Sequence, residues 1–109
     1  MRLPCIALAF FCVASNPAAA ITIIGFGTQT CGAWTEAAKT ESFARQMQRT
    51  WVAGYVSGVA ITRGRDFLEP TDFDGMMAWI DQYCAANPLR IIQYAADVLA
   101  FTLDRNLSD

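Results

Sequence analysis

The middle of the chain carries apolar residues at the three- and four-residue spacing of an amphipathic α-helix. The repeating positions are Phe43, Met47, Trp51, Gly54 and Gly58. We predict a helix that is capped by Thr40 or Ser42 and buries this stripe. Residues 51–61, WVAGYVSGVAI, are apolar on nearly every side, which predicts a segment buried at the centre of a helical bundle. Because glycine lowers helix propensity by about 1 kcal/mol, we expect another helix or side chain to approach Gly54 and Gly58 closely.

Two more helices are predicted after a loop over residues 62–71. Thr71 or Asp72 can cap the first of them, which we expect to end near residue 86. The pair Asn87-Pro88 is typical of a helix start and predicts a last helix that ends near residue 106. The apolar stripe of this last helix consists of Leu89, Ile92, Ala96, Leu99, Leu103 and Leu107.

Residues 21–30, ITIIGFGTQT, precede these helices and are rich in β-branched side chains and glycine. This composition predicts an extended arm or a short strand. A short helix is then expected to start near Cys31. The pattern as a whole predicts an all-α fold, a compact domain of three to four helices that follows a short extended arm.

The first twenty residues have the three-part pattern of a secretory signal peptide. Arg2 supplies the positive charge, residues 3–13 form an uncharged and nearly continuous apolar run, and Ala18-Ala19-Ala20 supplies small residues at the cleavage site. Eleven apolar residues are too few to cross a bilayer, which needs about twenty. We therefore expect cleavage after Ala20, a single helical domain over residues 21–109, a periplasmic location and no stable membrane insertion of the mature chain.

Removal of residues 1–20 changes the composition from which function is judged. The 109-residue chain becomes 89 residues long, with seven lysines and arginines against ten aspartates and glutamates, a formal net charge of −3. This charge does not favour nucleic-acid binding. The chain contains no histidine, which excludes Ser-His-Asp triads, Cys-His pairs and histidine-based zinc sites. We predict no cofactor and no metal site.

Two of the four cysteines, Cys31 and Cys84, remain in the mature chain. In an oxidising compartment a pair of cysteines in a small domain is expected to form a disulfide. The closed loop of 54 residues would stabilise the fold by about 4 kcal/mol in the chain-entropy model. A thiol oxidoreductase is disfavoured because the chain lacks a CxxC motif.

The arrangement resembles two families of small periplasmic helical proteins. The resemblance rests on Cys31-x-x-Trp34, the stretch GYVSGVA at 54–60, Cys84 late in the third helix, and Asn87-Pro88-Leu89. One family is the HdeA/HdeB acid-stress chaperones, whose members carry one disulfide at a similar separation. The other is the Tai-type immunity proteins, which neutralise peptidoglycan amidases and which the GYVSGVA and Asn-Pro-Leu stretches resemble more. The chain departs from the lysine-rich chaperones because it has a single lysine, Lys39.

Two sets of side chains suggest chemistry, and each also has a structural interpretation. The aromatic residues Trp34, Trp51, Tyr55, Trp79 and Tyr83 are expected to pack in the core. Asp72 and Asp74 are two residues apart and therefore do not share a helix face, and a helix start accounts for both. No two of Asp72, Asp74 and Asp81 form a credible acid–base pair. We therefore predict that the protein is not an enzyme.

The loop 62–71 is the candidate contact surface. Arg63 and Arg65 lie beside the apolar pair Phe67-Leu68, and arginine beside apolar anchors is typical of binding hot spots. We therefore expect a non-enzymatic binding protein of the immunity type that contacts another periplasmic or envelope protein, with a homodimer left open. The alternatives are an HdeA-like chaperone, whose acid response must come from carboxylates, and an accessory subunit of an envelope enzyme.

Overall fold

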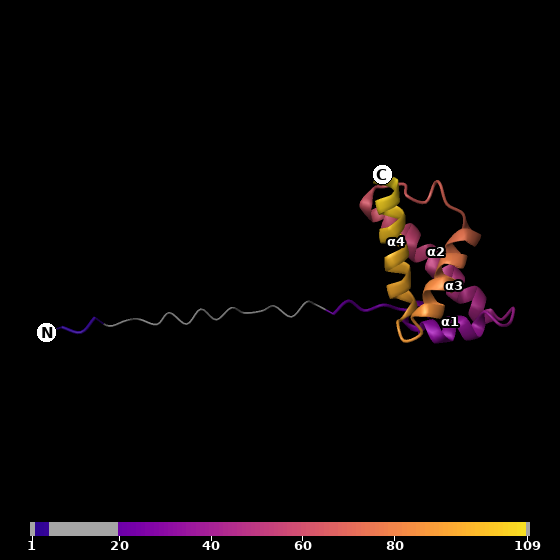
Figure 1. The fold of residues 1–109 in the computed structure, drawn as a ribbon, viewed down its shortest axis with the longest axis horizontal. Helices are drawn as coiled ribbons and strands as arrows, with labels where there is room; N and C mark the ends of the chain where they lie inside the picture. Colours follow the sequence, from indigo (N-terminus) through magenta and orange to yellow (C-terminus); the bar gives the residue numbers. More distant parts are fainter. Residues whose placement is uncertain (1, 5–19, 109) are drawn as a thin grey trace.

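The computed structural model describes residues 2–4 and 20–108. In this part of the chain a short 3-10 turn, η1 (Phe26–Thr28), precedes four α-helices (Figure 1). They are α1 (Cys31–Ala37), α2 (Phe43–Arg63), α3 (Phe73–Ala86) and α4 (Ile92–Ser108). The all-α prediction is confirmed, whereas the predicted signal peptide lies almost wholly outside the described residues. None of the helices in the described part is long and apolar enough to cross a membrane.

Polar side chains mark the helix starts. The oxygens of Thr30, Ser42 and Asp72 each accept a hydrogen bond from the backbone N–H three residues later, at the start of α1, α2 and α3 respectively. These bonds satisfy donors that have no partner inside the helix. Gly64 ends α2 in the left-handed conformation, with φ of 62°, which favours glycine. Capping by Ser42 and Asp72 and a start near Cys31 agree with the sequence pattern.

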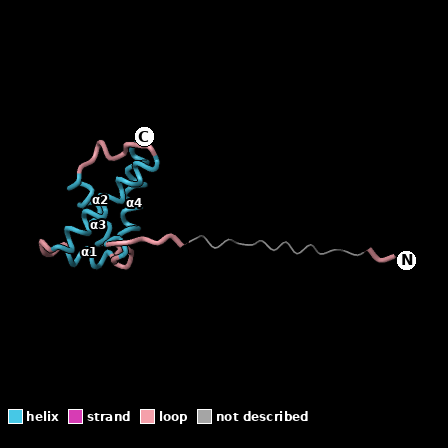
Figure 2. Tube along the Cα trace, turned by 180° about the vertical axis from the view of Figure 1, so that it is seen from behind, coloured by secondary structure: helices cyan, strands magenta, loops and turns pink. Residues whose placement is uncertain are grey.

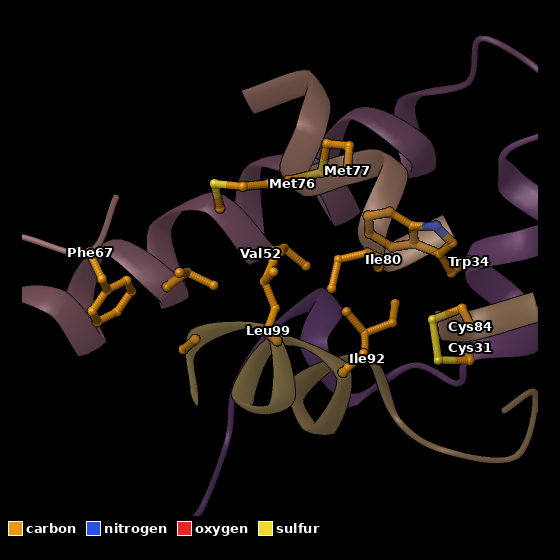
Figure 3. Packing of buried hydrophobic residues seen from close by; sticks show 14 residues of the cluster. Cys31, Trp34, Val52, Phe67, Met76, Met77, Ile80, Cys84, Ile92 and Leu99 are labelled. Atoms are coloured by element: carbon orange, nitrogen blue, oxygen red, sulfur yellow. A yellow bond between two sulfur atoms is a disulfide. The ribbon is translucent and has the colours of Figure 1, made fainter. Parts of the chain in front are cut away.

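The helices form a small bundle in which α4 packs against both α2 and α3. Helix α1 lies across one end of the bundle and packs against α3, while the loop between α2 and α3 lies at the opposite end, near the C-terminus (Figures 1 and 2). The core runs between these ends, from the disulfide to Phe67 (Figure 3). Its large, fully buried side chains include Trp34, Val52, Val56, Ile80, Ile92 and Leu99.

Cys31 and Cys84 form the predicted disulfide, which links the first residue of α1 to the last turn of α3. Their Cα atoms are 4.6 Å apart, and neither residue is accessible to solvent. A covalent link between residues 53 apart in sequence restricts the unfolded chain, and it holds α1 against the end of the bundle.

The predicted buried stripe of α2 is wrong at Phe43, Gly54 and Gly58, which are exposed, whereas Trp51 packs against the edge of the core. The buried positions are Gln48, Val52 and Val56, whereas Phe43 is largely exposed. The helix is also not buried on all sides, because Ile61 is 81% exposed. The shift has a physical reason: Val52 and Val56 have no polar atom to satisfy, while the neighbouring aromatic residues carry polar atoms that find partners at the edge of the core. Gln48 is buried as well: its Nε2 donates to Gln29 Oε1 at 2.9 Å, while its own Oε1 has no hydrogen-bond partner among the described residues.

The predicted start of the last helix is also wrong. Asn87 ends α3 instead: its backbone N–H donates to the Cys84 carbonyl, and its Nδ2 donates to the Tyr83 carbonyl. The chain then turns, leaves Leu89 92% exposed, and enters α4 at Ile92. Backbone hydrogen bonds between residues 29–31 and 90–92 hold this connection in place, including the isolated antiparallel bridge. The Ile92 N–H and the Arg90 carbonyl are bonded to residues 29 and 31, so they are not available for hydrogen bonds within a helix that starts at Pro88.

Candidate functional site

The loop after α2 does not present the apolar anchor that the sequence predicts. Helix α2 continues through Arg63, and Phe67 is 1% exposed at the end of the core (Figure 3). Leu68 is partly buried and packs against the same core. These two side chains therefore fasten the loop to the bundle, and the expectation of Phe67 as a surface contact is corrected.

The two arginines of the loop region converge on one carboxylate of α4. Arg63 Nη1 donates to Asp104 Oδ2 at 2.7 Å, and Arg65 Nε donates to Asp104 Oδ1. Arg65 Nη2 also donates to Ser108 Oγ at 2.6 Å. The Asp104 side chain is only 15% exposed. Hydrogen bonds from Arg65 and then Arg63 hold the pKa of the Asp104 carboxyl below its ordinary value, because both favour the charged form.

The aspartates singled out in the sequence do not form a carboxylate pair. Asp72 caps α3, Asp74 lies 3.5 Å from an Arg49 nitrogen, and Asp81 accepts a hydrogen bond from Trp34. Each of the three therefore has a separate structural contact. Across residues 2–4 and 20–108, no group of three histidine, cysteine, aspartate or glutamate side chains is placed to hold a metal ion.

The aromatic residues pack in or against the core, as predicted. Trp34 is 1% exposed, while the other four are partly buried at the edge of the core. Two pairs stack along their helices: Trp51 on Tyr55, with ring centroids 5.0 Å apart, and Trp79 on Tyr83, at 5.4 Å. Burial also raises the pKa of the Tyr83 hydroxyl.

The outer face of α2 carries a shallow apolar depression that the sequence interpretation placed inside the bundle. Its volume is about 390 Å³, and it is lined by Gly54, Tyr55, Gly58, Val59, Thr62 and Arg63. A Cβ atom added at Gly54 or Gly58 would have no neighbour within 4 Å. Among the described residues, the expected close approach of another part of the chain is therefore absent at both glycines. The spacing of the glycines was visible in the sequence, but the direction that they face was not.

A second site, which the sequence analysis missed, joins α2 to α4. The Tyr55 hydroxyl donates to Asp97 Oδ1 at 2.6 Å, and Gln93 Nε2 donates to Asp97 Oδ2 and to the Tyr55 oxygen. Burial, and then the bond to Asp97, raise the pKa of Tyr55. Residues 21–24, of which Ile21 and Ile24 are largely exposed, line an open cavity together with this group, and Trp51 Nε1 donates to the Ile24 carbonyl at 2.9 Å. The Tyr55 and Asp97 pair was not detectable because 42 residues separate its members.

Comparison of the chain with protein-family models, curated proteins and solved structures finds no match.

Proposed function

We propose that the protein is an exported, non-enzymatic binding protein, and that the depression on α2 receives another envelope protein. The observation that carries this proposal is the exposure of Gly54 and Gly58, where a Cβ atom added to either would meet none of the described residues within 4 Å. Glycine in a helix interior costs about 1 kcal/mol relative to alanine. No packing contact within the described chain offsets that cost at these two positions, so we assign the offset to contact with a partner.

The chemistry of the depression suits a narrow apolar ridge. Two glycines four residues apart let a partner approach the helix backbone, while Tyr55 and Val59 offer apolar area on either side. Thr62 and Arg63 supply a polar edge at the C-terminal end of α2. Apolar centres with polar rims are typical of protein interfaces. We therefore propose that the depression binds a helix or loop of another exported protein.

The resemblance to Tai-type proteins directs the choice of partner. In an immunity role the partner is a peptidoglycan amidase, and in an accessory role it is another envelope enzyme. The single disulfide and the small helical scaffold suit either role in an oxidising compartment. Both roles use the same surface, so one experiment on that surface tests the binding function before the partner is known.

The test compares two variants that add the same side chain. Gly58→Leu fills the depression, whereas Ala85→Leu places leucine on an exposed position of α3, away from it. Each tagged chain is exported, cross-linked in cells and purified with its partners. We expect the unchanged chain and Ala85→Leu to capture the same protein, and Gly58→Leu to capture it at least tenfold less. Equal capture by both variants, capture of only a second copy of this chain, or no capture under any growth condition would reject the proposal.

A second candidate function, an acid-stress chaperone, is favoured by the contact of Arg63 and Arg65 with Asp104. Protonation of Asp104 at low pH would remove its charge and weaken the attachment of the loop to α4. Phe67, the buried side chain by which that loop packs on the core, would then become available to unfolded clients. Aggregation of a client protein at pH 2, with and without this protein, tests the candidate. Unchanged aggregation removes it.

A further inference from the structure

We propose that the cavity between residues 21–24 and helices α2 and α4 binds the α-ammonium group of Ile21, with Asp97 as its counter-ion. This inference rests on the predicted cleavage after Ala20, which belongs to the export component of the proposed function. It goes beyond that function because it assigns a binding site to the new chain end. The group that binds there belongs to the protein itself: it is the N-terminal ammonium of Ile21, which exists only after cleavage.

Both the future chain end, Ile21, and its proposed counter-ion, Asp97, line the cavity. Its volume is about 650 Å³. One wall consists of Ile21, Thr22, Ile23 and Ile24, and the other of Trp51, Tyr55, Gln93 and Asp97. The residue that becomes the chain end and a carboxylate therefore face the same space before cleavage takes place.

The arm is anchored at Ile24, which leaves the three residues before it to carry the chain end along the cavity that Asp97 lines. Trp51 Nε1 holds the Ile24 carbonyl at 2.9 Å, and Gly27 packs against the Trp51 ring so closely that a Cβ atom there would overlap it. The three residues from Ile24 back to Ile21 span at most about 10 Å. The Trp51 and Tyr55 ring centroids are 5.0 Å apart, and the Tyr55 hydroxyl lies 2.6 Å from Asp97. The path of contacts from Trp51 through Tyr55 to Asp97 is therefore similar in length to the reach of residues 21–24.

Asp97 has the charge and the free bonding capacity that an ammonium group needs. Its carboxylate is partly buried and accepts hydrogen bonds from Tyr55 and Gln93, both of them neutral donors. Within the described residues, none of the ion pairs involves Asp97. A carboxylate accepts about four hydrogen bonds, and an ammonium carries three donors. Tyr55 is the other titratable side chain on the cavity wall. Its ordinary pKa of about 10 already keeps it neutral at pH 7, and burial raises that pKa further.

Cleavage converts a poor ligand for Asp97 into a good one. Water adds to the Ala20 carbonyl carbon and the Ala20–Ile21 C–N bond breaks. Ala20 leaves as a carboxylate, while the Ile21 nitrogen takes up the released protons as an ammonium. Before cleavage the same nitrogen is a neutral amide with one N–H. The site therefore distinguishes the processed chain from its precursor. It also orders the arm beside Tyr55, which lines the partner-binding depression on α2.

The test measures the α-amine directly. The chain that begins at Ile21 contains all four helices and every core residue. It is compared at pH 7 with Asp97→Asn and, as a matched control, with Asp104→Asn, whose carboxylate lies in a separate contact at the end of α4. A carboxylate within about 4–6 Å raises the pKa of an ammonium by about one unit or more, so acylation of the Ile21 amine should be about tenfold slower in the unchanged chain than in Asp97→Asn. Asp104→Asn should remain slow.

Equal acylation rates with aspartate and asparagine at position 97 would overturn the site. If Asp97→Asn does not fold, NMR of the unchanged chain decides instead. Contacts between Ile21 and the Tyr55 ring should be present, and they should disappear when Ala18-Ala19-Ala20 is retained ahead of Ile21. Their absence from the chain that begins at Ile21 rejects the site.

Mass spectrometry of the exported protein tests the cleavage position separately, and a natural chain end other than Ile21 would reject the physiological occupant. Neither result depends on whether a partner binds α2.

Discussion

Trp34 Nε1 donates a 2.7 Å hydrogen bond to Asp81 Oδ1, which joins α1 to α3 beside the disulfide. Trp34 lies three residues after Cys31, and Asp81 lies three residues before Cys84. One helical turn therefore separates each member of the hydrogen-bonded pair from the covalent link. The two contacts together fix both the position and the rotation of α1 on the bundle. Both contacts hold the seven-residue helix α1 against α3.

Asp81→Ala is expected to destabilise the protein by about 1–3 kcal/mol, because it leaves the N–H of a buried indole without an acceptor. Asp81→Asn keeps an acceptor oxygen and should cost less. Urea unfolding monitored by circular dichroism measures both. Gln82→Ala, at an exposed position of the same helix, is the matched control and should stay within about 0.5 kcal/mol of the unchanged chain. An Asp81→Ala cost no larger than that of Gln82→Ala would contradict a structural role for the bond.

The attachment of Asp104 to Arg65 and Arg63 predicts a specific dependence of stability on pH. The pKa of the carboxyl is lowered in the folded state, so its stabilisation is fully present above the unfolded value of about 4. It is lost as the pH falls through the lower folded value. We expect Asp104→Asn to be less stable than the unchanged chain at pH 7, with the difference shrinking below about pH 4. Urea unfolding at pH 7, 4 and 2 follows this change, and a difference that is constant over this range would refute the assignment.

Phe67 and Leu68 are adjacent in the sequence, but they should differ in their contribution to stability. Phe67→Ala removes a fully buried ring at the end of the core and is expected to cost about 3–5 kcal/mol. Leu68→Ala removes a partly buried side chain and should cost clearly less. Thermal and urea unfolding measure both free energies. A Phe67→Ala variant as stable as the unchanged chain would instead restore the interpretation of Phe67 as a surface anchor.

Features that depend on neighbouring residues were predictable from the sequence. Ser42 and Asp72 cap their helices because a side-chain oxygen reaches a backbone N–H within the same turn, whatever the rest of the fold does. The pairing of Cys31 with Cys84 followed because the predicted cleavage leaves two cysteines. The all-α fold followed from the spacing of apolar residues over long segments.

Features that depend on distant parts of the chain were not predictable. Trp51 and Val52 both fit a helical apolar stripe, and a segment that is apolar on most sides does not show which of them faces the core. Asn87 is as suitable for ending α3 as for starting the next helix, and pairing between residues 29–31 and 90–92 decides between the two. The contact of Tyr55 with Asp97 likewise exists only once α2 lies beside α4.

The exposed glycines of α2 lead to a prediction in which stability and binding change in opposite directions. Both glycines lie inside a helix, and an added Cβ meets nothing within 4 Å in the part of the chain that the structure describes. Gly54→Ala and Gly58→Ala should therefore each stabilise the isolated protein by about 0.5–1 kcal/mol, because alanine has the higher helix propensity. Urea unfolding measures these gains.

Gly27→Ala is the contrasting control, because its new Cβ would overlap the Trp51 ring and the variant should be less stable than the unchanged chain. If Gly54 and Gly58 serve a partner, the same two alanine variants should bind that partner more weakly in spite of their higher stability. The methyl group that improves the helix occupies the space that the partner needs. Destabilisation by either alanine would show that a neighbour within the chain already fills the depression, and unchanged binding would show that the partner uses another surface.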